Sequence, residues 1–140
     1  MLFRSSNDRI KGVLFLCTHN AGRSQMAAGF MRTLGDGKVR VFSGGSEPAS
    51  QVNPAAIEVM NEVAIDIANY VPQKWSMEML HEVDVVVTMG CGDTCPYIPG
   101  KRYVDWPLVD PAGLGADAVR PIRDEIKSLV EQLLTELTKS

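Results

Sequence analysis

A cysteine and an arginine separated by five residues are the part of this sequence best suited to chemistry. Cys17 and Arg23 enclose the segment Thr-His-Asn-Ala-Gly, and Ser24 follows directly. Successive backbone N–H groups in such a loop can curl into a nest that binds an anion. The planar guanidinium of Arg23 matches two oxygens of a tetrahedral oxyanion. The positive field that binds the anion also stabilises the thiolate form of Cys17, so we predict a nucleophilic cysteine beneath a bound oxyanion.

The predicted oxyanion-binding residues are those of the loop itself. Most would act through backbone N–H groups, so the side chain of His19 is interpreted as an exposed spacer, although it could tune Cys17. Ser24 could donate a hydrogen bond to the Cys17 thiolate, and Gly22 leaves the approach to the anion open. The full predicted set comprises Thr18, His19, Asn20, Ala21, Gly22, Arg23 and Ser24. The alternative is a buried cysteine that ends a strand, with Arg23 on the surface.

Two further cysteines, Cys91 and Cys95, lie in a segment that also contains glycine and aspartate. We interpret them as a redox pair that forms a disulfide across a turn, because their neighbours indicate exposure. One alternative is half of a tetrahedral metal site, which would need Cys17 and either His19 or His81 to complete it. Another alternative is a pair of inert thiols.

A carboxylate in the last third of the chain, Asp110, has two interpretations. It precedes Pro111, and an Asp-Pro dipeptide is common in turns, so a turn alone could explain it. A carboxylic acid held over the anion site could also give a proton to a departing oxygen. The second interpretation predicts that Asp110 acts as a general acid beside Cys17.

The elements that must position these residues are predicted from apolar patterning. Four short apolar or β-branched runs indicate strands at residues 13–16, 39–42, 84–89 and 102–106. Strands that alternate with helices predict an α/β fold, a three-layer α/β/α domain with a mostly parallel sheet. Right-handed crossovers place the loops after such strands at one sheet edge, where ligands bind. Cys17, Ser43, Cys91 and Asp110 all follow predicted strands and could converge there.

Helices are predicted from the spacing of apolar residues and from capping residues. The periodicity predicts helices at 24–34 and 118–138, with Pro121 near the first turn of the second. Asn53, followed by a proline, predicts the start of another helix, with Asn53 as its cap. Val63 belongs to the predicted core face of that helix.

Length and composition restrict the function further. The 140 residues, with 14 Lys and Arg against 17 Asp and Glu, predict one domain, which we place at 12–140 after a flexible polar leader at 1–11. The net charge of −3 argues against nucleic-acid binding, and no segment has the ~20 consecutive apolar residues of a membrane span. The leader lacks a signal-peptide core, and three cysteines are an odd number for a secreted disulfide framework. We therefore expect a cytoplasmic protein.

Five segments occur in a characteristic order: CTHNAGRSQMAAGF, VFSGG, NPAAIEVMNEVAIDI, VVVTMGCGDTCP and DWPLVDPAG. Together they resemble arsenate reductases of the low-molecular-weight tyrosine phosphatase superfamily, over residues 12–138. The Cys-x5-Arg-Ser loop is shared with the phosphatases, whereas the downstream cysteine pair is typical of the thioredoxin-coupled reductases. The resemblance implies a four-stranded parallel sheet and the reduction of arsenate to arsenite in arsenic detoxification.

By this resemblance, Cys17 is the nucleophile that attacks arsenate, and Asp110 helps water to leave. Cys91 then attacks the sulfur of Cys17 and releases arsenite, and Cys95 moves the disulfide to an exposed Cys91–Cys95 pair that thioredoxin reduces. Arg23 and the loop bind the oxyanion, for which phosphate and sulfate would compete. The reductant is external, and no tightly bound cofactor or metal is implied.

Two loop positions depart from the family pattern. Gly22 stands where many members have a second cysteine, which is usually not a redox residue. Only three residues separate Cys91 from Cys95, fewer than in the best-known thioredoxin-linked members. A disulfide can still form across this spacer if the two Cα atoms approach to ~4.4–6.8 Å, but a long looped-out rearrangement is not expected.

A third departure concerns potassium. Ala28 replaces an acidic residue that helps some family members to bind potassium near the loop, whereas Asn20, Ser43 and Asp66 remain. The chain therefore keeps part of a potassium site, and we do not predict that potassium is required.

Other functions would use the same nucleophile. A tyrosine-phosphate phosphatase would use Cys17, Arg23 and Asp110 alike, because phosphate and arsenate are nearly isosteric. Such phosphatases usually carry tyrosine after the Asp-Pro, and here Ala112 and Gly113 follow. An arsenate reductase that takes mycothiol or glutathione as its donor would leave the two extra cysteines without a role, and a non-enzymatic arsenite or metal sensor would leave the oxyanion loop without one. The sequence leaves monomer and homodimer open.

Overall fold

The computed structural model describes residues 10–89 and 97–139. Its four strands are all parallel, in the order β2-β1-β3-β4. They are β1 (Lys11–Leu16), β2 (Val39–Gly44), β3 (Val85–Thr88) and β4 (Arg102–Asp105). The predicted four-stranded parallel sheet is confirmed, although β1 begins two residues earlier and β2 ends two residues later than predicted.

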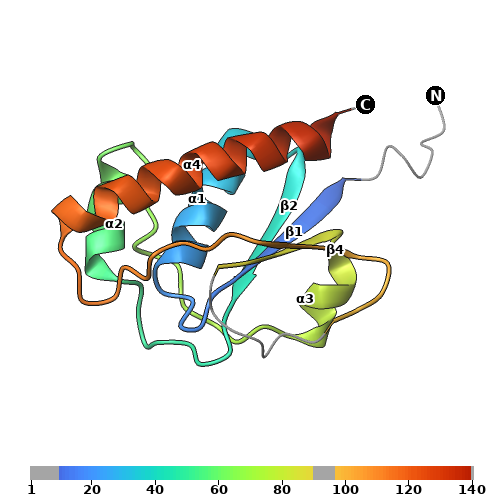
Figure 1. The fold of residues 1–140 in the computed structure, drawn as a ribbon, viewed down its shortest axis with the longest axis horizontal. Helices are drawn as coiled ribbons and strands as arrows, with labels where there is room; N and C mark the ends of the chain where they lie inside the picture. The colour runs from blue at the N-terminus through green and yellow to red at the C-terminus, as the bar shows by residue number, and fades with distance from the viewer. Residues whose placement is uncertain (1–9, 90–96, 140) are drawn as a thin grey trace.

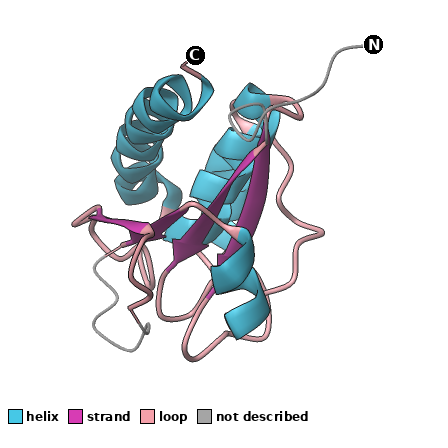
Figure 2. Cartoon of the chain, turned by 90° about the vertical axis from the view of Figure 1, so that its right-hand side faces the viewer, coloured by secondary structure: helices cyan, strands magenta, loops and turns pink. Residues whose placement is uncertain are grey.

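Helices cover both faces of the sheet, but unequally. They are α1 (Arg23–Gly35), α2 (Pro54–Asn61), α3 (Met77–Glu82) and α4 (Ala116–Thr138). Figure 1 shows α4 lying across α1 and α2 on one side, and Figure 2 shows α3 on the opposite side of the sheet. The predicted three layers are therefore present, with one layer reduced to α3. Within the described part of the chain, no helix combines the length and apolar character that crossing a membrane requires.

Strand β1 contributes to two separate cores, one on each face. Val13 and Phe15 belong to the large core under α1 and α4, whereas Leu14 and Leu16 pack with Leu80 of α3. All five side chains are almost completely buried. Burial on both faces explains why β1 is an uninterrupted apolar run that ends at the first polar loop.

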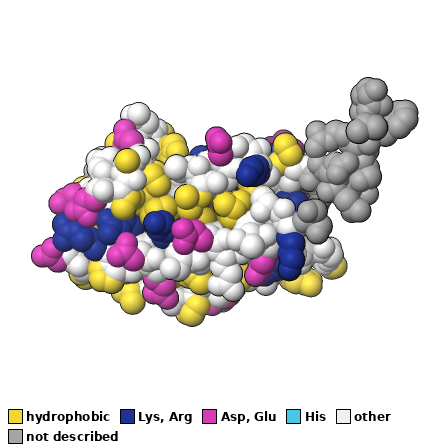
Figure 3. All heavy atoms as spheres, turned by 90° about the horizontal axis from the view of Figure 1, so that it is seen from above, with side chains coloured by type: hydrophobic (Ala, Val, Ile, Leu, Met, Phe, Trp, Pro, Cys, Tyr) yellow, Lys and Arg dark blue, Asp and Glu magenta, His cyan; other side chains and the backbone are white. Residues whose placement is uncertain are grey.

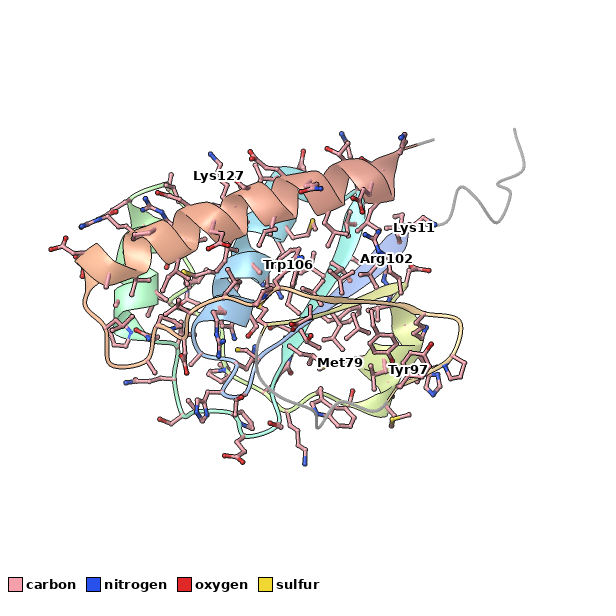
Figure 4. The ribbon with its side chains drawn as sticks, viewed as in Figure 1. Lys11, Met79, Tyr97, Arg102, Trp106 and Lys127 are labelled. Atoms are coloured by element: carbon pink, nitrogen blue, oxygen red, sulfur yellow. The ribbon has the colours of Figure 1, made fainter. Side chains whose placement is uncertain are left out.

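The chain after β4 turns back beneath α4. Trp106 is buried there (Figure 4), and its ring centroid lies 5.8 Å from that of Phe15. Its backbone N–H donates to the carbonyl oxygen of Thr88 at 2.7 Å, and Leu108 is also buried. These contacts bring Asp110 to the edge of the sheet where β1 and β3 end.

Helix α2 begins as predicted and ends earlier. The side-chain oxygen of Asn53 accepts hydrogen bonds from the first turn, which makes Asn53 its cap. The helix ends at Asn61, and Ala64 adopts the left-handed conformation with φ of 64°. The chain therefore leaves the helical path before Val63, which is 37% exposed. The predicted core role of Val63 is wrong.

Helix α4 begins at Ala116, two residues before the predicted start. The N–H groups of Ala118 and Val119 both donate to the carbonyl oxygen of Gly115 at 3.1 Å, which extends the helix at its N-terminus. Pro121 therefore lies in the second turn, near the first turn as predicted but beyond the positions where proline is tolerated best.

Charged side chains join the start of α4 to the end of α2. The Glu62 carboxylate accepts hydrogen bonds from Arg120 Nη2 at 2.7 Å and Arg123 Nη1 at 2.8 Å. Figure 3 shows acidic and basic side chains gathered at this end of the molecule. The hydrogen bond from Arg120, reinforced by Arg123, lowers the pKa of Glu62 from 4.5 to about 2. This ion-pair cluster ties the two helices together above the sheet.

Candidate active site

The loop between β1 and α1 places Cys17 and Ser24 in direct contact. Cys17 is buried where β1 ends, and its Sγ lies 2.9 Å from Ser24 Oγ. Asn20 Nδ2 donates to the same hydroxyl oxygen at 2.7 Å. Because Ser24 accepts this hydrogen bond, its own hydroxyl hydrogen is left to point at the sulfur. The geometry therefore suits the predicted hydrogen bond from Ser24 to a Cys17 thiolate.

The side chain of Asn20 fixes the middle of the loop. Asn20 is fully buried with φ of 50°, a left-handed conformation that asparagine tolerates better than most residues. Its Oδ1 accepts from the backbone N–H of Gln73 at 2.9 Å and from Gln25 Nε2 at 3.2 Å. Sequence reasoning missed both glutamines. Gln25 carried a signal, because a glutamine on the buried face of an apolar helix needs a polar partner.

The loop carbonyls are turned outward. The carbonyl oxygens of Thr18, His19 and Ala21 accept hydrogen bonds from backbone N–H groups of the segment 47–53, at 2.8 to 2.9 Å. In a trans peptide the next N–H points opposite to the carbonyl. The N–H groups that follow these three carbonyls therefore point away from the segment 47–53, which leaves them available to an anion-binding nest.

A glycine behind the loop allows this close packing. A Cβ atom on Gly45 would lie 2.5 Å from the carbonyl oxygen of Thr18 and 2.6 Å from that of Cys17. No side chain fits at those distances, so Gly45, which directly follows β2, supports the loop by being a glycine. Gly45 was not among the predicted site residues.

Arg23 is anchored on one side and open on the other. Its side chain is 7% exposed, and Nη1 donates to the carbonyl oxygens of Met89 and, at 3.2 Å, Leu108. Its buried Nε has no hydrogen-bond acceptor among the described residues. Nε and Nη2 form one edge of the guanidinium, and this edge can hold two oxygens of one anion. The alternative that places Arg23 on the surface is wrong.

Asp110 approaches the open edge of Arg23. Its Oδ2 lies 3.8 Å from Arg23 Nη2, and its Oδ1 accepts a hydrogen bond from the N–H of Ala112 at 3.0 Å. The carboxylate is 53% exposed. The turn and the proximity to the anion loop occur together, so the turn interpretation does not exclude the general-acid interpretation.

Cys17, Arg23 and Asp110 line one small cavity. Its volume is about 30 Å³, and Pro111 and Gly22 are also among the residues that line it. A shallow groove of about 540 Å³ adjoins this cavity, and the two share the lining residues His19, Ala21, Asn53 and Ala112. His19 is exposed as expected, and its Nδ1 lies 3.0 Å from the carbonyl oxygen of Glu47. The cavity suits a small oxyanion, whereas the groove is open to solvent.

Cys91 and Cys95 lie outside the described residues. The disulfide and metal interpretations of this pair therefore remain predictions. Among the residues that are described, no group of three or more His, Cys, Asp or Glu side chains could hold a metal ion.

The sheet, the Cys-x5-Arg-Ser loop at its carboxyl edge and the nearby carboxylate define the class of this protein. Residues 12–95 match the family described as low molecular weight phosphotyrosine protein phosphatase. The chain belongs to this family.

Relatives within the family carry a more particular name. The glutaredoxin arsenate reductase of Synechocystis sp. is 39% identical over 132 residues, which is 92% of this chain and all of that protein. A Corynebacterium glutamicum thioredoxin-dependent arsenate reductase superposes with a TM-score of 0.81 at 38% identity, over 91% of this chain and 62% of that one. An arsenate reductase in its phosphate-binding state has a TM-score of 0.82 at 37% identity, over 91% and 99% of the two chains.

Proposed function

We propose that this protein reduces arsenate to arsenite. The observation that carries the proposal is the buried Arg23, whose Nε has no hydrogen-bond acceptor among the described residues and whose side chain lines the same cavity as Cys17. Such a site suits a tetrahedral oxyanion and a thiolate nucleophile. The similarity to arsenate reductases along nearly the whole chain favours arsenate as the substrate.

The oxyanion would bind through three groups of donors. The backbone N–H groups of His19, Asn20 and Gly22 and the N-terminus of α1, which begins at Arg23, both favour negative charge. The guanidinium adds two parallel N–H donors. Phosphate and sulfate share the tetrahedral shape and would therefore compete with arsenate.

The first chemical step replaces an oxygen of arsenate by sulfur. The Cys17 thiolate, hydrogen-bonded by Ser24, attacks arsenic and forms an As–S bond. One oxygen leaves as water after Asp110 gives it a proton. Arsenic keeps its +5 state, because an oxygen ligand has been exchanged for sulfur without electron transfer.

Reduction needs a second thiol, and we assign it to Cys91. Attack of Cys91 on the Cys17 sulfur forms a disulfide, and the As–S electron pair passes to arsenic, which leaves as arsenite in the +3 state. Cys95 then attacks Cys91, which frees the Cys17 thiolate and leaves a Cys91–Cys95 disulfide. Met89, whose carbonyl accepts a hydrogen bond from Arg23, is two residues before Cys91 and six before Cys95 in the chain. This spacing supports Cys91 as the cysteine that attacks Cys17 first.

We propose thioredoxin as the external reductant and the cytoplasm as the location. A disulfide between two cysteines of one chain is the kind of substrate that a dithiol reductant reduces by exchange. The name of the Corynebacterium glutamicum structure agrees with thioredoxin, whereas the name of the Synechocystis relative includes glutaredoxin. Both systems keep thiols reduced in the cytosol.

Potassium has no role in the proposal, because the residues do not fit it. Ala28 is fully buried and brings no oxygen, and Asn20 Oδ1 already accepts two hydrogen bonds. Asp66 is exposed, and its Oδ1 accepts the N–H of Ala68 at 2.9 Å. We therefore expect arsenate reduction without added potassium.

A weak phosphatase activity is expected from the same residues. Cys17, Arg23 and Asp110 could act on a phosphate ester, and the family is that of the phosphatases. The residue after Pro111 is the exposed Ala112, which offers no ring to stack on an aromatic leaving group. Arsenate reduction is therefore proposed as the main activity.

The test is arsenate-dependent NADPH oxidation, with thioredoxin and its reductase compared with glutaredoxin- and mycoredoxin-based donors. We expect turnover with thioredoxin and none for Cys17→Ser. Cys91→Ser should stop turnover, with at most an arsenic adduct on Cys17. Cys95→Ser should release one arsenite and stall as a Cys17–Cys91 disulfide, which mass spectrometry after alkylation identifies. Normal turnover of both downstream variants with a small-thiol donor would contradict the intramolecular relay.

A further inference from the structure

The loop that carries Asp110 is attached to the rest of the molecule at one buried ring. Between Val109 and Gly115, Pro111 alone is buried, and its neighbours on both sides are exposed. Val109 is 65% exposed. A buried proline inside an exposed loop indicates that the loop is held in place at that position.

The ring of Pro111 lies against Gly22 of the anion loop. A Cβ atom on Gly22 would lie 2.6 Å from Pro111 Cγ and 3.5 Å from Pro111 Cδ. Carbon atoms in favourable contact are ~3.5–4.0 Å apart, so any side chain at position 22 would displace the ring. Gly22 has φ of −124°, outside the left-handed region, so a left-handed backbone conformation is not the reason for a glycine at this position. In this chain, the space that a Cβ atom would need is occupied by Pro111.

Two contacts flank Asp110 and limit where its carboxylate can lie. On one side the carbonyl oxygen of Leu108 accepts a hydrogen bond from Arg23 Nη1 at 3.2 Å. On the other side Pro111 contacts Gly22. Between these contacts, Asp110 Oδ2 lies 3.8 Å from Arg23 Nη2.

We propose that Gly22 is a positioning residue: by leaving room for the Pro111 ring, it holds Asp110 at the anion site. The inference rests on the proposed function, in which Asp110 gives a proton to the departing oxygen. A methyl group at position 22 would move the Pro111 ring by roughly 1 Å, the contact shortfall at Cγ. Misplacement of a reacting group by that amount can reduce a rate by about 10²-fold.

The test is a double-mutant cycle of Gly22→Ala and Pro111→Ala. Alanine at 111 removes Cγ and Cδ and keeps Cβ, which lies 3.9 Å from the place that a methyl group at position 22 would occupy. Rapid quench measures the rate at which arsenate forms its adduct with Cys17, and phosphate titration measures anion binding. Gly115→Ala is the matched control, because a Cβ there meets nothing within 4 Å.

We expect Gly22→Ala to slow adduct formation at least about tenfold in the Pro111 protein and less than about threefold in the Pro111→Ala protein. The phosphate Kd should change less than about threefold, because Arg23 and the loop N–H groups remain. In an Asp110→Asn background, Gly22→Ala should add little further loss, because the acid it positions is absent. Gly115→Ala should behave as the wild type does.

Three results would overturn the positioning role. One is an unchanged rate of adduct formation in Gly22→Ala. Another is that Gly22→Ala slows adduct formation by the same factor whether residue 111 is proline or alanine. The third is a parallel loss of phosphate binding, which would mean that the anion loop itself is distorted. If Gly22→Ala folds poorly, Pro111→Ala must restore folding. Wild-type protein without arsenate turnover would instead refute the proposed function, and hydrolysis of p-nitrophenyl phosphate, which needs the same acid, would then report on Asp110.

Discussion

Replacing Arg23 by lysine tests the anion site without changing the net charge. The guanidinium uses Nη1 for the carbonyl oxygens of Met89 and Leu108, whereas Nε has no acceptor among the described residues, and we propose that Nε and Nη2 bind the anion. A lysine ammonium has three donors at a single point and cannot serve both directions. We therefore expect Arg23→Lys to lose at least one of the two hydrogen bonds to the oxyanion.

The size of the effect follows from the number of donors. A hydrogen bond to a charged group contributes about 1.5–3 kcal/mol, and 1.4 kcal/mol is a factor of ten in affinity. Loss of one such bond should raise the phosphate Kd about 10- to 150-fold. A carbonyl left without its donor should also lower the unfolding temperature.

Protection of Cys17 from alkylation is a suitable assay. Bound phosphate should slow the reaction of Cys17 with iodoacetamide, and the phosphate concentration at half-protection gives Kd at fixed ionic strength. Arg32→Lys is the control, because Arg32 lies on the same helix, is exposed and packs over the ring of Tyr70 at 4.5 Å. An unchanged phosphate Kd in Arg23→Lys would refute the assignment of the open guanidinium edge to the anion.

Three further predictions concern the acid, the loop support and the ion-pair cluster. Asp110→Asn should slow formation of the Cys17 adduct by about 10²–10⁴-fold in rapid quench, with phosphate Kd nearly unchanged; slowing of later thiol exchange alone would contradict the acid role. Gly45→Ala should lower stability by about 1–3 kcal/mol in urea unfolding and weaken phosphate binding, because its Cβ would meet loop carbonyls at 2.5 and 2.6 Å; normal binding would argue against the support role. Glu62→Gln should lower the unfolding temperature at pH 7. Because the folded pKa of about 2 lies below the usual 4.5, that difference should shrink as the pH falls from 4.5 toward 2, and a constant difference would refute the ion-pair explanation.

Local patterns were enough to predict the sheet and the position of Cys17 at the end of its first strand. Strand β1 is buried on both faces, so its residues are apolar without interruption and its end is marked by the first polar loop. The cap of α2 at Asn53 depends only on neighbouring residues and was also predicted. Parallel strands end at one sheet edge, which is why the predicted strands were enough to indicate that Cys17 and Asp110 could converge there.

Local patterns failed where the chain departs from regular periodicity. Val63 has the spacing of a core residue on a helix. The helix ends at Asn61, so helical spacing no longer predicts which way the Val63 side chain points, and it is exposed. Nothing local predicted this end, because the left-handed residue that follows is Ala64 and not glycine. The roles of Cys91 and Cys95 stay predictions.

The sequence by itself determined the reactive residue types, their spacing and the sheet edge at which they meet. Only the tertiary structure decided how Arg23 is held, because its acceptors are the backbone carbonyls of Met89 and Leu108, 66 and 85 positions away. Every residue has a backbone carbonyl, so the residue types at these two positions could not predict that they bind Arg23. The contact between Pro111 and Gly22 could not be predicted from the sequence either, because folding brings the Pro111 ring to Gly22 from a distant part of the chain.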